Sequence, residues 1–155
     1  MLPYEDLKEF GLFEQLTNGE LMDIAVLCHK HCYDEGATCF VQGREATEFH
    51  LCRSGRVDII VKLGLPWDIE ATVHTVTGGE ILGWSALVRP YIYTASAKCI
   101  ERTQDIYING SDLRNLFKGR HRMAYEVMTN LSAVISSRLT ETRLKLAEAV
   151  ARAVQ

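Results

Sequence analysis

The stretch Thr77-Gly78-Gly79-Glu80-Ile81-Leu82-Gly83-Trp84-Ser85-Ala86-Leu87, followed after a short gap by Tyr93-Thr94-Ala95-Ser96-Ala97, is the most informative part of this sequence. Two glycines and a glutamate that lead from a strand into a short helical turn let backbone N–H groups converge on an anion. The carboxylate of Glu80 can then accept hydrogen bonds from vicinal hydroxyls. The stretch predicts either a binding loop for a hydroxyl-bearing anion or a plain glycine-rich turn.

Around this stretch, from about Cys32 to Asn109, the sequence reads as short β-strands. Strand-like runs are separated by glycines at 36, 43, 55, 64, 78, 79 and 83. In residues 49–54 the side chains Phe49, Leu51 and Arg53 alternate with His50, Cys52 and Ser54. The run ends at Ser54-Gly55, a tight hairpin turn, and residues 57–63, rich in β-branched side chains, form the return strand. This pattern indicates an antiparallel sandwich, roll or barrel. Since no strand–helix–strand alternation occurs, a doubly wound nucleotide-binding fold is not expected.

Helical patterns flank the β region on both sides. Thr17-Asn18-Gly19-Glu20 fits a capping box, and apolar residues then repeat at helical spacing up to about His31. From about His121 to Val154 there is neither Gly nor Pro, which corresponds to roughly 50 Å of helix. We therefore expect two short N-terminal helices and one long C-terminal helix.

The long helix carries an apolar stripe close to heptad spacing, interrupted by one polar residue. Its members are Met128, Leu131, Ile135, Leu139, Thr142, Leu146 and Val150. The stripe is longer than a small domain needs. We expect its first half to pack on the β region and the rest to pair with a second copy of the chain; the alternative is a stripe packed wholly on its own β region.

Composition limits the classes of protein that the chain can belong to. A length of 155 residues with 47% hydrophobic and 24% charged residues predicts one domain, or one domain with an arm. A net charge of −3 argues against a mainly electrostatic nucleic-acid binder. No apolar run is long enough for a membrane span, and no secretory leader is visible. We expect a cytoplasmic protein.

The five cysteines are odd in number and scattered, which favours reduced thiols over a disulfide framework. In Cys28-His29-Lys30-His31-Cys32, taken as a helix end, the two thiols share a face and the imidazoles point elsewhere. No second pair follows at zinc-finger spacing, so we expect no metal site. An iron–sulfur or haem site is the alternative.

The chain as a whole resembles the cyclic nucleotide-binding domain of the CRP/FNR superfamily. The resemblance covers roughly residues 10–140 and rests on Gly79-Glu80, Thr94-Ala95, Asp34-Glu35-Gly36 with Gly43, and the hairpin Leu51–Val57. It implies a mainly β fold with flanking helices (α+β): a double-stranded jelly-roll β-roll with N-terminal helices and a long C-terminal helix. Residues 1–120 would form the β-roll domain, and residues 121–155 the dimerisation and signalling arm.

The resemblance also implies a ligand site, the phosphate-binding cassette, of approximate pattern Gly-Glu-hydrophobic followed by Arg-Ser/Thr-Ala. In the family the Glu binds the ribose 2′-hydroxyl and the Arg pairs with the cyclic phosphate. The expected ligand-binding residues are Gly79, Glu80, Ile81, Leu82, Arg89, Tyr93 and Thr94. Tyr93 stands where the family has Arg, and it can donate a hydrogen bond but no charge. Arg89 either reaches the pocket or lies in solvent, and Trp84 either stacks on a base or fills space.

Two functions follow from this resemblance. The first is a stand-alone ligand-sensing regulatory domain that binds a small molecule, with a cyclic nucleotide (cAMP or cGMP) as the candidate, and signals through its C-terminal helix. The alternative is a protein–protein interaction scaffold whose pocket is filled by its own side chains. Because the chain ends at Gln155, directly after the long helix, we expect no DNA-recognition helix and no direct DNA binding.

An enzyme is not expected. A cupin-like metal enzyme would need clustered histidines on facing strands, and only His50 and His74 are expected in strands. No His-x-His pair is expected within the roll, and no Gly-x-Ser-x-Gly elbow is present. The sequence therefore predicts no catalytic residues and no metal ligands.

Overall fold

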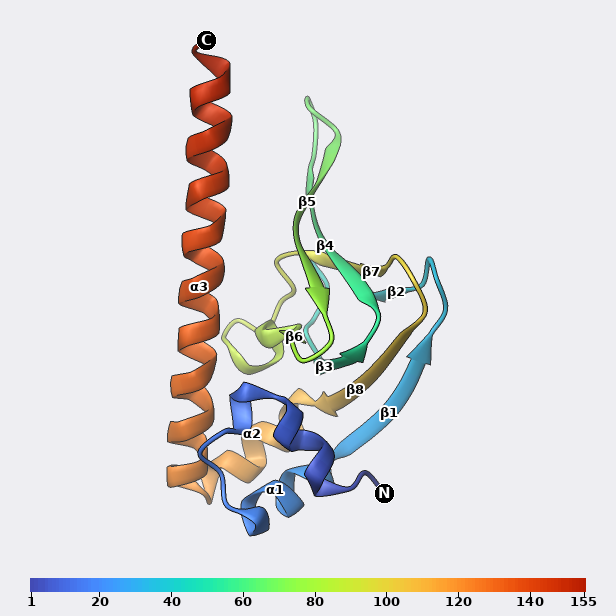
Figure 1. Ribbon diagram of the computed structural model, residues 1–155, viewed down its shortest axis with the longest axis vertical. Coiled ribbons are helices and arrows are strands. Elements are labelled where there is room, and N and C mark those ends of the chain that lie inside the picture. The colour runs from blue at the N-terminus through green and yellow to red at the C-terminus, as the bar shows by residue number, and fades with distance from the viewer.

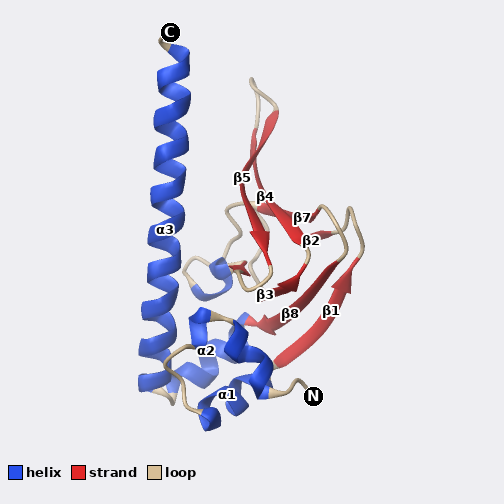
Figure 2. Cartoon of the chain, viewed as in Figure 1, coloured by secondary structure: helices blue, strands red, loops and turns tan.

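The computed structural model describes residues 1–155 as a β-roll with short helices at one end and one long helix along its side (Figures 1 and 2). The helical elements are η1 (Tyr4–Glu9), η2 (Gly11–Phe13), α1 (Asn18–Ala25), η3 (Trp84–Leu87), α2 (Gly110–Lys118) and α3 (His121–Ala153). The strands are β1 (Cys28–Tyr33), β2 (Thr38–Phe40), β3 (Glu48–Ser54), β4 (Arg56–Leu63), β5 (Ile69–Thr77), β6 (Ile81–Leu82), β7 (Ser96–Cys99) and β8 (Thr103–Asn109). The expected mainly β roll with flanking helices is confirmed.

The strands form two four-stranded antiparallel sheets, in the orders β1-β8-β3-β6 and β2-β7-β4-β5. Because side chains alternate across a strand, each sheet turns one apolar face inward. Phe49 and Leu51 of β3 and Ile106 of β8 are fully buried in the main core. The short strand β6 pairs with β3 at the sheet edge and carries the chain from the end of β5 into η3.

The N-terminal helices cover one end of the roll. The predicted capping box is present: the Thr17 hydroxyl oxygen accepts from the Glu20 N–H at 3.2 Å, and the Glu20 carboxylate accepts from the Thr17 N–H at 2.9 Å. Leu21 and Ile24 of α1 are buried in the core.

The expectation that helix continues to about His31 is wrong, because Cys28–Tyr33 forms β1 and pairs with β8. His29 and His31 therefore share one strand face, and a His-x-His pair does lie in the roll. The His29 ring stacks on Tyr107, with centroids 5.0 Å apart. No group of His, Cys, Asp and Glu side chains is arranged to hold a metal ion, and all five cysteines are free thiols.

Helix α3 changes environment along its length. Met123, Val127 and Leu131 are buried against the domain. Further on, Leu139 and Leu146 are 47% and 64% exposed. The outer part of α3 and the β4–β5 hairpin extend in the same direction (Figure 1). None of the helices combines the length and the hydropathy that crossing a membrane requires.

Candidate ligand-binding site

The segment Thr77–Glu80 is a tight turn between β5 and β6, in which the Glu80 N–H donates to the Thr77 carbonyl at 3.1 Å. Gly79 has a φ of +93°, and a Cβ on Gly78 would lie 2.7 Å from a backbone oxygen of β3, so both glycines are required. As expected, Gly78-Gly79-Glu80 follows a strand and leads toward a short helical turn, η3. Strand β6 intervenes because it pairs with β3, and η3 begins only after Gly83.

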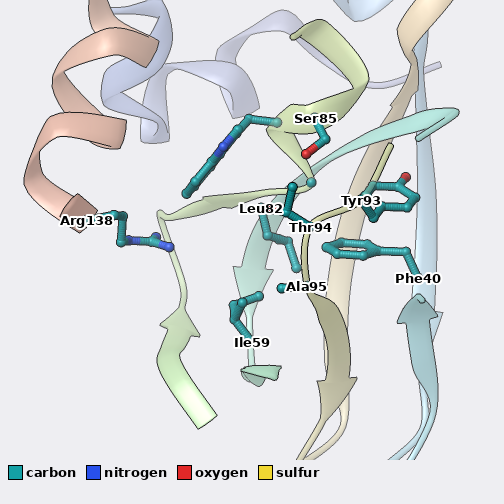
Figure 3. A pocket seen from close by; sticks show the side chains of 10 residues that line it. Phe40, Ile59, Leu82, Ser85, Tyr93, Thr94, Ala95 and Arg138 are labelled. Atoms are coloured by element: carbon teal, nitrogen blue, oxygen red, sulfur yellow. The ribbon is translucent and has the colours of Figure 1, made fainter. Parts of the chain in front are cut away.

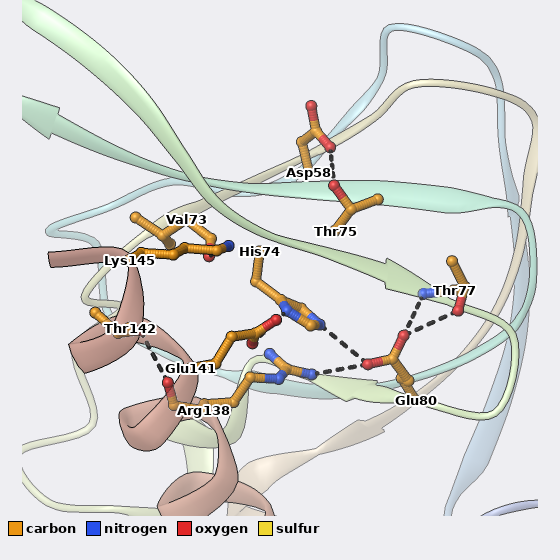
Figure 4. A network of polar contacts seen from close by, with 10 residues as sticks. All are labelled: Asp58, Val73, His74, Thr75, Thr77, Glu80, Arg138, Glu141, Thr142 and Lys145. Carbon is orange, nitrogen blue, oxygen red and sulfur yellow. Dashed lines mark hydrogen bonds and ion pairs between the residues drawn. The ribbon is translucent and has the colours of Figure 1, made fainter. Parts of the chain in front are cut away.

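The Glu80 carboxylate is the centre of a polar network (Figure 4). One oxygen, Oε2, accepts from the Thr77 N–H at 2.8 Å and from the Thr77 hydroxyl at 2.9 Å. The other, Oε1, lies 3.0 Å from His74 Nε2 and accepts from Arg138 at 3.3 Å. Since a carboxylate has about four acceptor positions, Glu80 is saturated by the protein itself.

These contacts set the ionisation of Glu80. Burial acts to raise the pKa of this carboxyl, but the hydrogen bonds from Thr77 and His74 together outweigh it and hold the pKa below its ordinary value. The other ring nitrogen of His74, Nδ1, lies 2.9 Å from Glu141 Oε2 on α3. Both nitrogens of His74 can donate only when the imidazole is protonated. Glu80 is therefore a carboxylate that faces the Arg138 guanidinium and the His74 ring.

Three α3 side chains with helical spacing make these contacts, because residues three, four and seven apart share a helix face. Arg138 reaches Glu80, Glu141 reaches His74, and Lys145 Nζ donates to the Val73 carbonyl at 2.8 Å. Burial lowers the pKa of Arg138, while the charges of Glu80 and Glu141 act in the opposite direction. The middle of α3 is thus joined to β5 and to the β5–β6 turn by polar contacts.

An inner pocket of about 70 Å³ lies inside the roll beside this network (Figure 3). It is lined by Phe40, Ile59, Leu82, Gly83, Trp84, Ser85, Tyr93, Thr94, Ala95 and Arg138. The Arg138 guanidinium lies 5.3 Å from the centre of the Trp84 ring. Pockets for small molecules usually enclose roughly 300–1,000 Å³. The inner pocket is therefore too small, in this conformation, for a nucleotide.

A second hollow, the outer groove, measures about 420 Å³ and lies between the β5–β6 turn and α3. It is lined by Gly11, Gly79, Glu80, Ile81, Ala133, Val134, Ser137 and Arg138. Arg138 is the one residue that lines both hollows, so its side chain lies at the boundary between them.

The residues expected to bind ligand are divided between the two hollows. The outer groove is lined by Gly79, Glu80 and Ile81, and the inner pocket by Leu82, Tyr93 and Thr94. Arg89 lines neither hollow and is exposed, in the loop after η3. Trp84 lines the inner pocket. Whether this set binds a ligand stays a prediction.

Tyr93, at the position of the family arginine, has its polar group turned to the backbone. Its hydroxyl donates to the Glu48 carbonyl at 2.7 Å and accepts from the Glu48 N–H at 3.2 Å. Its ring stacks on Phe40 with centroids 4.1 Å apart, and the side chain is buried. The hydroxyl of Tyr93 is therefore already paired within the protein.

Sequence reasoning missed Arg138, which the structure places at the centre of the site. A signal for it exists, because residue 138 lies seven positions after Leu131 and three after Ile135, on the face of α3 that packs against the domain. An arginine on the inner face of an amphipathic helix needs a partner in the domain.

Comparisons with known proteins agree with this architecture. The model of the cyclic nucleotide-binding domain family matches residues 30–120. A Rhodopseudomonas palustris protein that carries the name of a potassium channel protein is 28% identical over 116 residues, which are 75% of this chain and 27% of that protein. The chain therefore spans about a quarter of the length of this relative.

Solved structures show the same fold. A cyclic nucleotide-binding protein from Geobacter metallireducens GS-15 is similar with a TM-score of 0.80 and 29% identity, covering 90% of this chain and 99% of that one. Thermus thermophilus catabolite activator protein has a TM-score of 0.71 and 27% identity, covering 90% and 62%. The regulatory domain of Toxoplasma gondii PKA, co-crystallised with cAMP, has a TM-score of 0.73 and 18% identity, covering 87% and 49%. Since the family model matches more than half of its residues, this chain belongs to the cyclic nucleotide-binding domain family.

Proposed function

We propose that the chain is a ligand-sensing regulatory domain that binds a cyclic nucleotide, cAMP or cGMP, between the β-roll and α3. The observation that carries this proposal is the position of Arg138, which lines both hollows and is hydrogen-bonded to Glu80. A ligand in this place must contact α3 directly. The family membership supports the class of ligand, and the chain acts by binding and not by catalysis.

Binding at Glu80 requires a rearrangement. A ligand hydroxyl can pair with the carboxylate only if one of the present donors leaves, since all acceptor positions are filled. The Arg138 contact, at 3.3 Å, is the longest of the four. Displacement of Arg138 releases the middle of α3 from the turn, which gives the ligand-free and ligand-bound states different positions of the helix.

In this proposal residues 1–120 are the sensing unit and residues 121–155 the arm that transmits the signal. The exposed apolar side chains of the outer half of α3, Leu139, Leu146 and Val150, continue the heptad-like stripe beyond the buried part. A second copy of the chain covers them in a homodimer, and the protein works in the cytoplasm.

One alternative has support of its own. The inner pocket encloses about 70 Å³, and Glu80 is saturated by protein donors. Both observations favour a scaffold for protein–protein interaction whose pocket is filled by its own side chains. In that case α3 would hold a partner protein without any ligand.

Isothermal titration calorimetry with cAMP and cGMP separates the two functions. The sensing domain is expected to bind at least one of them with one site per chain. The variant Ala95→Phe, which projects a ring into the inner pocket, is expected to abolish the heat of binding while circular dichroism remains unchanged. Absence of binding, and of any thermal shift, with the wild-type protein at millimolar nucleotide would support the scaffold instead.

A further inference from the structure

We infer that Arg138 of α3 supplies the positive charge that pairs with the anionic group of the bound ligand. Arg138 is the one cationic residue among all those that line the inner pocket and the outer groove. The inference rests on the proposed function, because it assigns a role in the same site. It differs from the expectation that the cation comes from the loop around Tyr93, since Arg89 lines neither hollow.

The guanidinium of Arg138 has unused hydrogen-bonding capacity. It carries five N–H donors, and its one hydrogen bond within the protein is the 3.3 Å contact to Glu80. The face of the Trp84 ring lies 5.3 Å away, and the Glu141 carboxylate is a further negative charge nearby. A guanidinium can bind a phosphate in a bidentate manner, through two parallel N–H···O hydrogen bonds. An anion at the boundary of the two hollows would therefore find free donors on Arg138.

If Arg138 exchanges Glu80 for the ligand as its partner, both Arg138 and Glu80 remain paired. When Arg138 turns to the ligand, Glu80 keeps its two bonds from Thr77 and its contact with His74. The acceptor position that Arg138 leaves is then open to a ligand hydroxyl. The fitting ligand is a monoanion with a hydroxyl close to the charge, which is the chemistry of a cyclic ribose phosphate.

Movement of Arg138 also provides space and an aromatic surface. Since Arg138 lies at the boundary between hollows of about 70 and 420 Å³, its displacement joins them into one site. A volume of this size is within the range of roughly 300–1,000 Å³ that small ligands occupy. The ring of Trp84, no longer faced by the guanidinium, can then stack on a planar base.

The test compares cyclic nucleotides with neutral nucleosides that have the same base. Calorimetric affinities for cAMP and adenosine, and for cGMP and guanosine, are measured for the wild-type protein, Arg138→Gln and Arg138→Lys. Arg138→Gln is expected to weaken cyclic nucleotide binding roughly tenfold to a hundredfold and to leave nucleoside binding unchanged, because it removes a hydrogen bond to a charged group. Arg138→Lys is expected to keep part of the preference for the anion.

Arg143→Gln is the matched control, since it removes a guanidinium from the same helix at an exposed residue that lines neither hollow. It is expected to leave all four affinities unchanged. Equal nucleotide affinities of the wild-type protein and Arg138→Gln would overturn the role of Arg138 and leave the sensing function standing. An equal loss of nucleotide and nucleoside binding would also overturn it, since that result describes a structural effect. If the wild-type protein binds none of the four compounds, both this inference and the proposed function fail.

Discussion

Glu80 and Arg138, 58 residues apart in the sequence, are hydrogen-bonded at 3.3 Å. The contact lies at the point where α3 changes from a packed to an exposed helix: Leu131 is buried on one side of it, and Leu139 is 47% exposed on the other. Beyond this point α3 is held mainly by the polar contacts of Glu141 and Lys145 with β5. The charge on Glu80 therefore contributes, through Arg138, to the attachment of the middle of α3 to the roll.

The variant Glu80→Gln is expected to loosen the middle of α3. It keeps the shape of the side chain but removes the charge that faces Arg138 and His74. Partly exposed ion pairs contribute up to about 1 kcal/mol, which corresponds to a roughly fivefold loss of protection. Hydrogen–deuterium exchange should be faster in residues 134–145 and unchanged around Met123 and Val127, which are buried.

Glu148→Gln, at an exposed position of the same helix, is the control and should leave the exchange pattern unchanged. If Glu80→Gln and Glu148→Gln give the same exchange in residues 134–145, Glu80 does not attach the helix.

Acid should weaken the wild-type protein more than Glu80→Gln. The pKa of Glu80 in the folded protein is lowered from 4.5. The unfolded chain therefore binds the proton more readily, so this group stabilises the fold above the unfolded pKa and loses that contribution as the pH falls through the folded pKa. Urea denaturation at pH 7 and at several values between about pH 5 and pH 3 should show the difference in unfolding free energy between the two proteins shrinking with acid.

The wild-type protein must be compared with Glu80→Gln because Asp105 also makes the stability of the fold depend on pH. Burial raises the pKa of Asp105, opposed by its hydrogen bond with His50, so its own contribution to stability falls as the pH rises. This opposite trend is present in both proteins and cancels in their difference. A difference in unfolding free energy that does not change with pH would contradict the role of Glu80.

Tyr93→Phe tests whether the Tyr93 hydroxyl stabilises the fold or contacts the ligand. The change keeps the ring stacked on Phe40 but leaves the half-buried backbone groups of Glu48 without this partner. We expect a loss of about 1–2 kcal/mol in unfolding free energy, measured by urea denaturation. Calorimetric affinity for cyclic nucleotide should not change. Tyr125→Phe, at a side chain that is 69% exposed, should alter neither quantity. Weaker binding of the cyclic nucleotide with an unchanged unfolding free energy would place the hydroxyl in the binding site instead.

The parts of the fold that depend on local sequence could be predicted, and the parts that depend on distant contacts could not. The capping box at Thr17 was identified because its two hydrogen bonds lie within three residues. The sequence pattern predicts helix where strand β1 lies, because the pairing of Cys28–Tyr33 with β8 joins segments far apart in the chain.

The candidate site shows the same division. The turn at Gly78-Gly79 can be predicted from its glycines, because Gly79 has a positive φ and a Cβ on Gly78 would collide with the backbone of β3. Arg138 is not predicted, since its partner Glu80 lies 58 residues away. The burial of Tyr93 likewise depends on Phe40 and Glu48, in two other strands. Sequence pattern and spacing therefore identify the loop, whereas tertiary packing determines which side chains line the inner pocket and the outer groove.

Leu146→Glu should shift a dimer of the chain toward the monomer. Leu146 is 64% exposed and lies in the heptad-like stripe, seven residues after Leu139. In a parallel pair of α3 helices the two copies of residue 146 would face each other, so the substitution would place two carboxylates in an apolar seam. Sedimentation velocity over a range of concentrations should give a dimer dissociation constant that is raised about tenfold or more.

Leu144→Glu is the matched control for this experiment. Leu144 is 61% exposed, but it lies two residues before Leu146 and outside the stripe, on the face of the helix turned away from a partner. It should therefore change the charge and hydropathy of α3 by the same amount without changing the dissociation constant. A wild-type protein that stays monomeric at all concentrations, or equal effects of the two variants, would exclude the outer half of α3 as the dimer seam.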